Sequence, residues 1–229
     1  MNLALIGYGK MGRLVEELAL SRGHRVLFKI DIEGNEQGQA LTAEHLNGVD
    51  VAVDFSIPDA VLRNVERITA LGISMVVGTT GWWNQLEKAR RLVQENRVGF
   101  VYGSNFSIGV NVFFQLMEAA ATLIQQHPQY DPWIYEIHHR AKLDAPSGTA
   151  LRLKQILEKA YGERAFSVAS NRAGTIPGEH IVGFDSESDT LTFTHTARSR
   201  LGFASGALHA AEWIQDHKGF YEFSATFSR

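Results

Sequence analysis

Short apolar runs alternate with amphipathic segments through the first hundred residues of the chain. The apolar runs predict strands at residues 3–6, 25–30, 51–55, 74–77 and 98–102. The amphipathic segments between them predict helices at residues 11–22, 58–70 and 83–96. Ser56 is the predicted N-cap of the second helix, with Pro58 in its first turn. This alternation predicts a parallel sheet covered by helices on both faces.

The pattern changes after residue 102, where longer helical periods and alternating strands take over. Helices are predicted at about 109–126, from about 147 onward and at 203–213, and strands at 133–139, 180–184 and 190–197. The last two strands flank a polar turn and predict a hairpin. We therefore predict an α/β protein with a Rossmann-type parallel-sheet domain and a second, α+β unit from about residue 108 to 201.

Composition and charge narrow the class of protein. The net charge of −3 argues against partners recognised by bulk charge, so neither nucleic acid nor a membrane is expected. No apolar run approaches the length of a bilayer span, and the chain begins without a signal-like segment, which predicts a cytoplasmic protein. The absence of cysteine excludes thiolate catalysis and cysteine-bound metals, and we assign no metal.

A glycine-rich loop follows the first predicted strand and opens the first predicted helix. Its residues are Gly7, Tyr8, Gly9, Lys10, Met11 and Gly12. Gly7 permits a tight turn, Gly9 allows close approach of a pyrophosphate, and Gly12 allows close packing of helix and strand. The loop therefore predicts a dinucleotide site, and the alternative is a glycine-rich turn without a ligand.

The acidic residue that ends the second predicted strand bears on the choice of cofactor. Asp31 would accept hydrogen bonds from a ribose diol and repel a 2′-phosphate, which favours NADH over NADPH. Lys10, Arg13 and Lys29 would weaken that preference, so use of NADPH stays open. The alternative for Asp31 is a solvated acid at a strand end.

Two later loops are predicted on the same edge of the parallel sheet. They contribute Gly78, Thr79 and Thr80 after one strand, and Ser104, Asn105 and Phe106 after another. Because ligands bind at the carboxyl ends of parallel strands, both loops are candidates for contacting the nicotinamide end of the cofactor. Each loop could equally be an ordinary turn.

The segment from Glu136 to Ala150 concentrates groups suited to proton transfer and anion binding. Strand alternation places His138 on the more polar face and His139 on the aromatic face. Lys142 follows with a further proton or positive charge. Residues 144–149 predict a helix start, with Pro146 in the first turn and exposed backbone amides at Ser147, Gly148 and Thr149 that suit a carboxylate or phosphate. The alternatives are structural histidines and a hydrated helix end.

This segment resembles the signature of the 4-hydroxy-tetrahydrodipicolinate (dihydrodipicolinate) reductase family. The matching residues are Glu136-Ile-His-His-x-x-Lys142-x-Asp144-Ala-Pro-Ser-Gly-Thr-Ala150. Further matches occur in the family's order at residues 7–13, 54–56, 78–81, 105–111 and 200–207. The likeness covers most of the chain, although the chain is short between Asp31 and Val51 and has Ile32 where an arginine would favour NADPH.

The resemblance implies NAD(P)H-dependent reduction of 4-hydroxy-tetrahydrodipicolinate to tetrahydrodipicolinate in the diaminopimelate route to lysine. It implies that His138 and Lys142 handle the proton, that His139 contacts substrate, and that Gly148 and Thr149, with Ser147 beside them, bind a substrate carboxylate. It further implies a homotetramer formed through a substrate-binding domain, residues 108–201. Residues 1–107 and 202–229 would form the dinucleotide-binding domain.

Two other functions remain open at this point. One is a different two-domain amino-acid dehydrogenase, such as an aspartate dehydrogenase, which would turn over another amino acid. The other is a non-catalytic dinucleotide sensor, which would bind the cofactor tightly without oxidising it.

Overall fold

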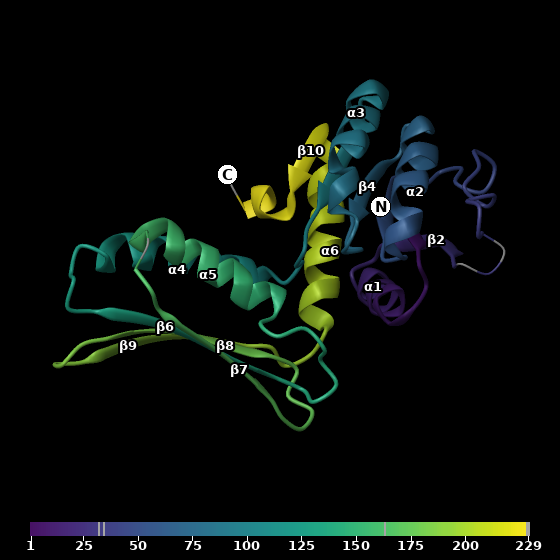
Figure 1. The fold of residues 1–229 in the computed structure, drawn as a ribbon. Helices are drawn as coiled ribbons and strands as arrows, with labels where there is room; N and C mark the ends of the chain where they lie inside the picture. Colours follow the sequence, from purple (N-terminus) through teal and green to yellow (C-terminus); the bar gives the residue numbers. More distant parts are fainter. Residues whose placement is uncertain (32, 34, 163, 228–229) are drawn as a thin grey trace. The chain divides into compact units, whose positions relative to one another are not determined.

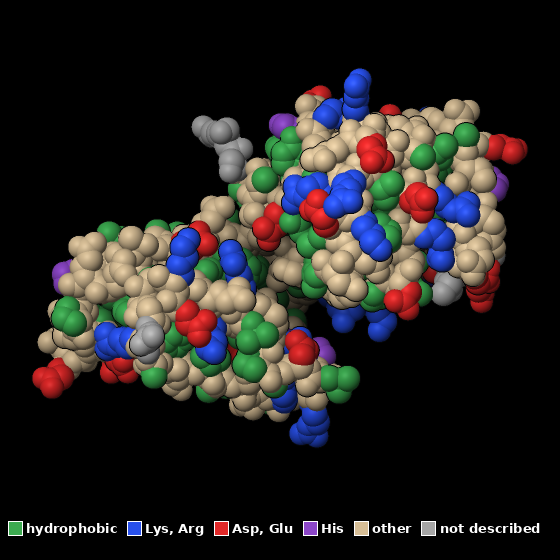
Figure 2. Space-filling view, turned by 45° about the horizontal axis from the view of Figure 1, so that its top comes forward, with side chains coloured by type: hydrophobic (Ala, Val, Ile, Leu, Met, Phe, Trp, Pro, Cys, Tyr) green, Lys and Arg blue, Asp and Glu red, His purple; other side chains and the backbone are tan. Residues whose placement is uncertain are grey.

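The computed structural model describes residues 1–31, 33, 35–162 and 164–227 of the chain. These residues form two compact units, the first comprising residues 1–107 and 203–229 and the second residues 108–202. Lysine, arginine and acidic side chains intermix over the visible surface (Figure 2). No helix in the described ranges is long and apolar enough to cross a membrane.

The first unit is built on a parallel sheet in the order β10-β5-β4-β3-β1-β2. Its strands are β1 (Asn2–Ile6), β2 (Arg25–Ile30), β3 (Val51–Asp54), β4 (Ser74–Val77), β5 (Gly99–Tyr102) and β10 (Gly219–Glu222). Its helices are α1 (Lys10–Ser21), α2 (Pro58–Ala70), α3 (Leu86–Asn96) and α6 (Leu201–Trp213), the last beginning two residues before the unit's boundary. The predicted Rossmann-type parallel sheet is confirmed (Figure 1).

The core of the first unit explains why its strands read as short apolar runs. Strands buried on both faces carry apolar side chains at nearly every position, and β3 and β4 are buried throughout. Helices α2 and α3 pack beside each other over one face, where Val61, Val65 and Val93 are fully buried. The carboxyl ends of β1, β3 and β4 therefore form one edge, from which the loops to α1, α2 and α3 leave.

The second unit places two helices on one face of a mixed sheet in the order β7-β6-β8-β9. Its strands are β6 (Asp131–His138), β7 (Ser167–Arg172), β8 (Glu179–Asp185) and β9 (Thr190–Thr196), and its helices are α4 (Ile108–Ile124) and α5 (Gly148–Tyr161). β7 is parallel to β6, whereas β8 and β9 form the predicted antiparallel hairpin. Both helices lie over the same face (Figure 1).

Some predicted boundaries and caps are wrong in detail. Residues 83–96 divide into a short 3-10 helix, Trp83–Gln85, followed by α3. The N-cap position of α2 is Ile57, with Pro58 directly after it, because Ser56 is bonded to Asp54 instead. Strands β7 and β10 were not predicted, since β7 is largely polar and exposed and β10 is short.

Candidate active site

The glycine loop fits a dinucleotide because two of its glycines touch backbone and one faces open space. A Cβ on Gly7 (φ +83°) would lie 2.4 Å from the Phe55 carbonyl oxygen. A Cβ on Gly12 would lie 2.6 Å from the carbonyl oxygen of Gly7, whereas one on Gly9 would meet nothing within 4 Å. Side chains at Gly7 and Gly12 would therefore push the loop apart, whereas Gly9 leaves room for a ligand.

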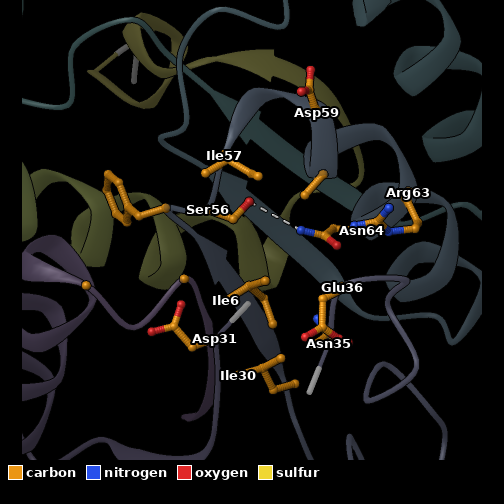
Figure 3. A pocket seen from close by; sticks show the side chains of 14 residues that line it. Ile6, Ile30, Asp31, Asn35, Glu36, Ser56, Ile57, Asp59, Arg63 and Asn64 are labelled. Atoms are coloured by element: carbon orange, nitrogen blue, oxygen red, sulfur yellow. Dashed lines mark hydrogen bonds between the residues drawn. The ribbon is translucent and has the colours of Figure 1, made fainter. Parts of the chain in front are cut away.

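A cavity of about 310 Å³ opens beside this loop at the carboxyl end of β1 and β2 (Figure 3). Asp31 lines it together with Gly7 and Gly9, as expected for a residue that contacts a ribose. Asn35, Glu36, Arg63 and Asn64 also line it, and none of these was predicted. Ile32, on which the prediction about the 2′-phosphate rested, lies outside the described residues.

A second cavity of about 460 Å³ joins the glycine loop to the loop after β4. Its lining includes Gly9, Lys10, Met11, Gly78, Thr79 and Thr80. The structure therefore brings these two predicted parts of the cofactor site together on one edge of the sheet. Gly78 packs closely against Phe55, since a Cβ there would lie 2.1 Å from the Phe55 ring.

The remaining predicted cofactor residues have other contacts in this structure. The Tyr8 hydroxyl donates to Glu16, and the Arg13 guanidinium and the Lys29 ammonium lie 4.9 and 5.0 Å from the centre of its ring. The loop after β5 lines neither cavity: Ser104 is exposed, Asn105 accepts a hydrogen bond from the Ser107 amide (2.8 Å), and Phe106 packs in the core against Phe223.

A buried carboxylate organises the edge between the two cavities. Asp54, at the end of β3, accepts hydrogen bonds from the Ser56 amide and hydroxyl, the Asn64 amide and the Thr79 hydroxyl at 2.6–3.0 Å. Its burial raises its pKa, while these donors act in the opposite direction. Asp54 thereby ties β3, α2 and the loop after β4 together. Sequence reasoning had explained this segment only as a helix cap.

The second unit collects its polar residues at the carboxyl end of β6. Burial alternates along this strand, so Ile134, Glu136 and His138 share one face, as predicted, and this face is the buried one that meets the helices. His139 follows the strand and is half-buried. Beside His138 stands Gly178, where a Cβ would lie 2.9 Å from the imidazole Nε2. A side chain at position 178 would therefore clash with the Nε2 edge of His138, and the glycine leaves room there.

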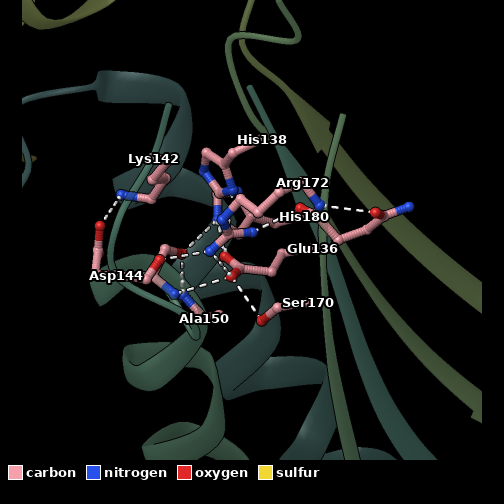
Figure 4. Close-up of polar contacts among 10 residues, drawn as sticks. Glu136, His138, Lys142, Asp144, Ala150, Ser170, Arg172 and His180 are labelled. Atoms are coloured by element: carbon pink, nitrogen blue, oxygen red, sulfur yellow. Dashed lines mark hydrogen bonds and ion pairs between the residues drawn. The ribbon is translucent and has the colours of Figure 1, made fainter. Parts of the chain in front are cut away.

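Glu136 is the centre of a hydrogen-bond network that links three elements (Figure 4). Its Oε1 accepts from the Ser147 amide (2.9 Å), the Ser170 hydroxyl (2.8 Å) and the Arg172 guanidinium (2.9 Å). Complete burial of the side chain alone would raise its pKa. The hydrogen bonds outweigh that effect and hold the Glu136 pKa at about 2, so the carboxylate is ionised.

The other oxygen of this carboxylate lies between two imidazoles. Oε2 of Glu136 is 3.4 Å from Nδ1 of His138 and 3.5 Å from Nε2 of His180, and the two rings meet edge to face. Burial and then the nearby His138 lower the His180 pKa to about 4. Burial also lowers the pKa of His138, against the opposing effect of Glu136. His180 is therefore neutral at physiological pH.

Lys142 lies in the loop that follows β6, within electrostatic range of His138. Its ammonium group donates to the Asp144 carboxylate at 2.7 Å, and its side chain is 23% exposed. Arg172 donates to the Asp144 carbonyl oxygen as well as to Glu136, so the loop is attached to the same network. The structure thus brings Lys142 to the site where His138 lies.

The helix start after this loop differs from the prediction. α5 begins at Gly148 with Ser147 as its N-cap, so Pro146 precedes the helix and is not in its first turn. The Ser147 amide is buried and donates to Glu136, and its hydroxyl accepts from the Ala150 amide. Gly148 lies in open space, where a Cβ would meet nothing within 4 Å. The accessible start of the helix is therefore Gly148 and the half-buried Thr149.

The spacing of Glu136, His138 and His180 would suit a metal ion, because their ligand atoms lie within 4.8 Å of one another. The guanidinium of Arg172 and the ammonium of Lys142 place two fixed positive charges beside them. These charges oppose a divalent cation, and we assign no metal to the site.

Sequence reasoning missed Arg172 and His180. His180 was the first residue of a predicted strand, and the parity shared with Val182 and Phe184 would have placed it on the helix-covered face. Arg172 gave no such signal, because β7 itself was not predicted.

Comparisons with known proteins give the same family for both halves of the chain. Family models described as dihydrodipicolinate reductase match its N-terminus over residues 1–106 and its C-terminus over residues 109–227. A 4-hydroxy-tetrahydrodipicolinate reductase of Christiangramia forsetii is 42% identical, covering 96% of this chain and 95% of the relative.

Solved structures extend the likeness to the fold. A dipicolinate-bound dihydrodipicolinate reductase from Paenisporosarcina sp. TG-14 has a TM-score of 0.81 at 21% identity, covering 98% of both chains. An amine dehydrogenase from Mycobacterium smegmatis has a TM-score of 0.66 at 10% identity, covering 100% of this chain and 96% of the other.

Proposed function

The chain belongs to the dihydrodipicolinate reductase family, and from that membership we propose how its residues divide the work of the reaction. It is an NAD(P)H-dependent reductase that converts 4-hydroxy-tetrahydrodipicolinate to tetrahydrodipicolinate in the diaminopimelate route to lysine. The balanced reaction takes up one hydride and one proton and releases one water molecule. The reduced nicotinamide, when bound, supplies the hydride.

His138 and Lys142 are the proposed proton-handling groups. The single observation that carries this assignment is their convergence at the end of β6, within electrostatic range of each other and next to Glu136. The ordinary pKa of histidine lies near neutral pH, and the lowered pKa of His138 makes its protonated ring a stronger proton donor. Lys142 keeps the site positive, which suits a dicarboxylate substrate.

The start of α5 is the proposed site for a substrate carboxylate. The amides of Gly148 and Thr149 stand at the positive end of the helix, and Gly148 leaves space for an anion. Ser147 supports this site as the cap and as a link to Glu136. His139, half-buried just beyond the strand, is a further proposed substrate contact.

The first unit is the proposed dinucleotide-binding domain and the second the substrate-binding domain. Asp31 in the cavity beside the glycine loop supports a preference for NADH, with NADPH as a second cofactor. We further propose a homotetramer assembled through the helix-free face of the second sheet, and a cytoplasmic location, where both reduced dinucleotides are available.

The test is a coupled assay in which the unstable substrate is generated in situ and oxidation of NADH and NADPH is followed. Turnover is expected, with a higher kcat/KM for NADH. His138→Gln and Lys142→Ala are expected to lower kcat by about 10²–10⁴-fold, the usual loss for a positioned acid. Lys154→Ala, which removes an exposed lysine on α5 that pairs with Glu158, serves as the control.

Tight cofactor binding without turnover would show a sensor rather than an enzyme. Turnover that survives both active-site substitutions at full rate would show that the proton comes from elsewhere.

A further inference from the structure

Glu136 is fixed in place by one of its two oxygens. Oε1 accepts three hydrogen bonds, from a backbone amide on the α5 side and from two side chains of β7. This arrangement keeps the carboxylate ionised and prevents it from rotating. Among the described residues, Oε2 has no hydrogen-bond partner and neither has Nδ1 of His138; the two atoms lie 3.4 Å apart, and Nε2 of His180 lies 3.5 Å from Oε2.

An ionised carboxylate can only accept hydrogen bonds, and this determines the tautomer of its neighbour. The ring nitrogen of His138 that pairs with it is Nδ1, at 3.4 Å, so this nitrogen is favoured as the protonated one. In the neutral ring the proton-free nitrogen is then Nε2. That is also the ring edge next to Gly178, where no side chain covers it.

We propose that Glu136 is a positioning residue that holds His138 by Nδ1 and thereby presents Nε2 as the atom that exchanges the proton with substrate. The proposal rests on the proposed role of His138 in the reaction. It assigns to Glu136 a task in catalysis beyond joining β6, β7 and α5. Glu136 itself touches no reacting atom.

His180 shares the oxygen without competing for the role. Its Nε2 lies 3.5 Å from Oε2 of Glu136 and 3.1 Å from the Ser147 hydroxyl oxygen, and its side chain is only 6% exposed.

 The His180 ring is inclined at 72° to the ring of His138. Because the His180 pKa is about 4, His180 is neutral at physiological pH and brings no charge of its own to the carboxylate.

Titratable groups face His138 from its own strand, from the loop that follows it, and from β7 and β8. Glu136 lies on its own strand, Lys142 and Asp144 lie in the following loop, Arg172 lies on β7, and His180 lies on β8. Glu136 and Asp144 favour the protonated ring, whereas Lys142 and Arg172 disfavour it. Of the two acids, Glu136 has the larger effect. Removing its charge should therefore lower the pKa of His138.

The test is Glu136→Gln, which keeps the shape of the side chain and removes its charge. If protonated His138 supplies the proton, kcat falls as pH rises through its pKa. In the variant this fall should occur about one pH unit lower, a shift typical of losing a neighbouring charge, with KM changed much less than kcat. Ser170→Ala is the matched control, because it removes a hydrogen bond to Oε1 and leaves the charge and Oε2 in place.

A second measurement reads the tautomer directly and needs no variant. In ¹⁵N-labelled wild-type protein, the neutral His138 ring should carry its proton on Nδ1, as seen in long-range ¹H–¹⁵N correlations. A proton on Nε2 instead would overturn the proposal, even if Glu136→Gln failed to fold. An unshifted pH profile in a folded Glu136→Gln would also overturn it. Full activity of His138→Gln would instead refute the proposed role of His138, while the tautomer measurement would still test the geometry.

Discussion

Two buried carboxylates, Asp54 and Glu136, each join segments that are far apart in the chain. Asp54 collects donors from α2 and from the loops after β3 and β4, and Glu136 collects them from β7 and the start of α5. Each stands at or near the carboxyl end of its strand, where the predicted ligand sites lie. At the scale of the residue, a buried carboxylate that accepts several hydrogen bonds therefore holds each of the two sites together.

Asp54→Ala should be strongly destabilising. It would leave the donors of Ser56, Asn64 and Thr79 without their acceptor, at a cost of about 2–4 kcal/mol in the free energy of unfolding. Urea unfolding measures this loss. Asp59→Ala, which removes an exposed acid in the first turn of α2, should cost less than about 1 kcal/mol. Equal losses for the two variants would contradict this account.

Individual residues were predicted well where a motif gave the local context. Within the second unit His138 and Lys142 come together, and within the first the glycine loop meets the loop after β4, because each follows a strand that the apolar pattern located. The partners of Glu136 could not be predicted in the same way. Arg172 and His180 reach it only through strand pairing, and the pairing of β6 with β7 depends on a strand whose exposed, polar sequence gives little signal.

At the scale of the element, β6, α5 and β7 form a strand–helix–strand unit inside the second domain. The helix was predicted from about residue 147 and begins at Gly148, but Pro146, predicted in its first turn, precedes it because the Ser147 side chain makes the cap. The long helix α4 and the hairpin were predicted more closely, since their apolar periods run over many residues.

Acid should destabilise the folded protein through His180. Its pKa is about 4 in the folded protein and near 6.5 in the unfolded chain, so the unfolded state binds more protons between these values. The free energy of unfolding should therefore fall as pH drops from about 6.5 to about 4. Glu136, with its pKa of about 2, should extend the loss from about pH 4.5 downward.

His180→Gln separates the two contributions. Urea midpoints measured between pH 7 and pH 4 should depend less on pH in this variant than in the wild type. An unchanged slope over that interval would mean that His180 does not carry the effect.

At the scale of the whole molecule, the helix-free face of the second sheet is the proposed surface of assembly. Thr192 and Thr194 on β9 lie on this face, and both are exposed. Thr194→Lys would place like charges in the contact between copies, where they would be desolvated. Light scattering should show a mass below that of a tetramer. Gln155→Lys, the same change in charge on an exposed position of α5, should leave the mass unchanged.

The two strand-to-helix junctions, β1 to α1 and β6 to α5, have a consequence for how such proteins diverge. One junction faces the proposed cofactor site and the other the proposed substrate site, on separate units of the chain. The amine dehydrogenase of Mycobacterium smegmatis shares this fold at low identity under a different enzyme name. Substitutions around the second junction can therefore accumulate without disturbing the first, because the two stand on separate units.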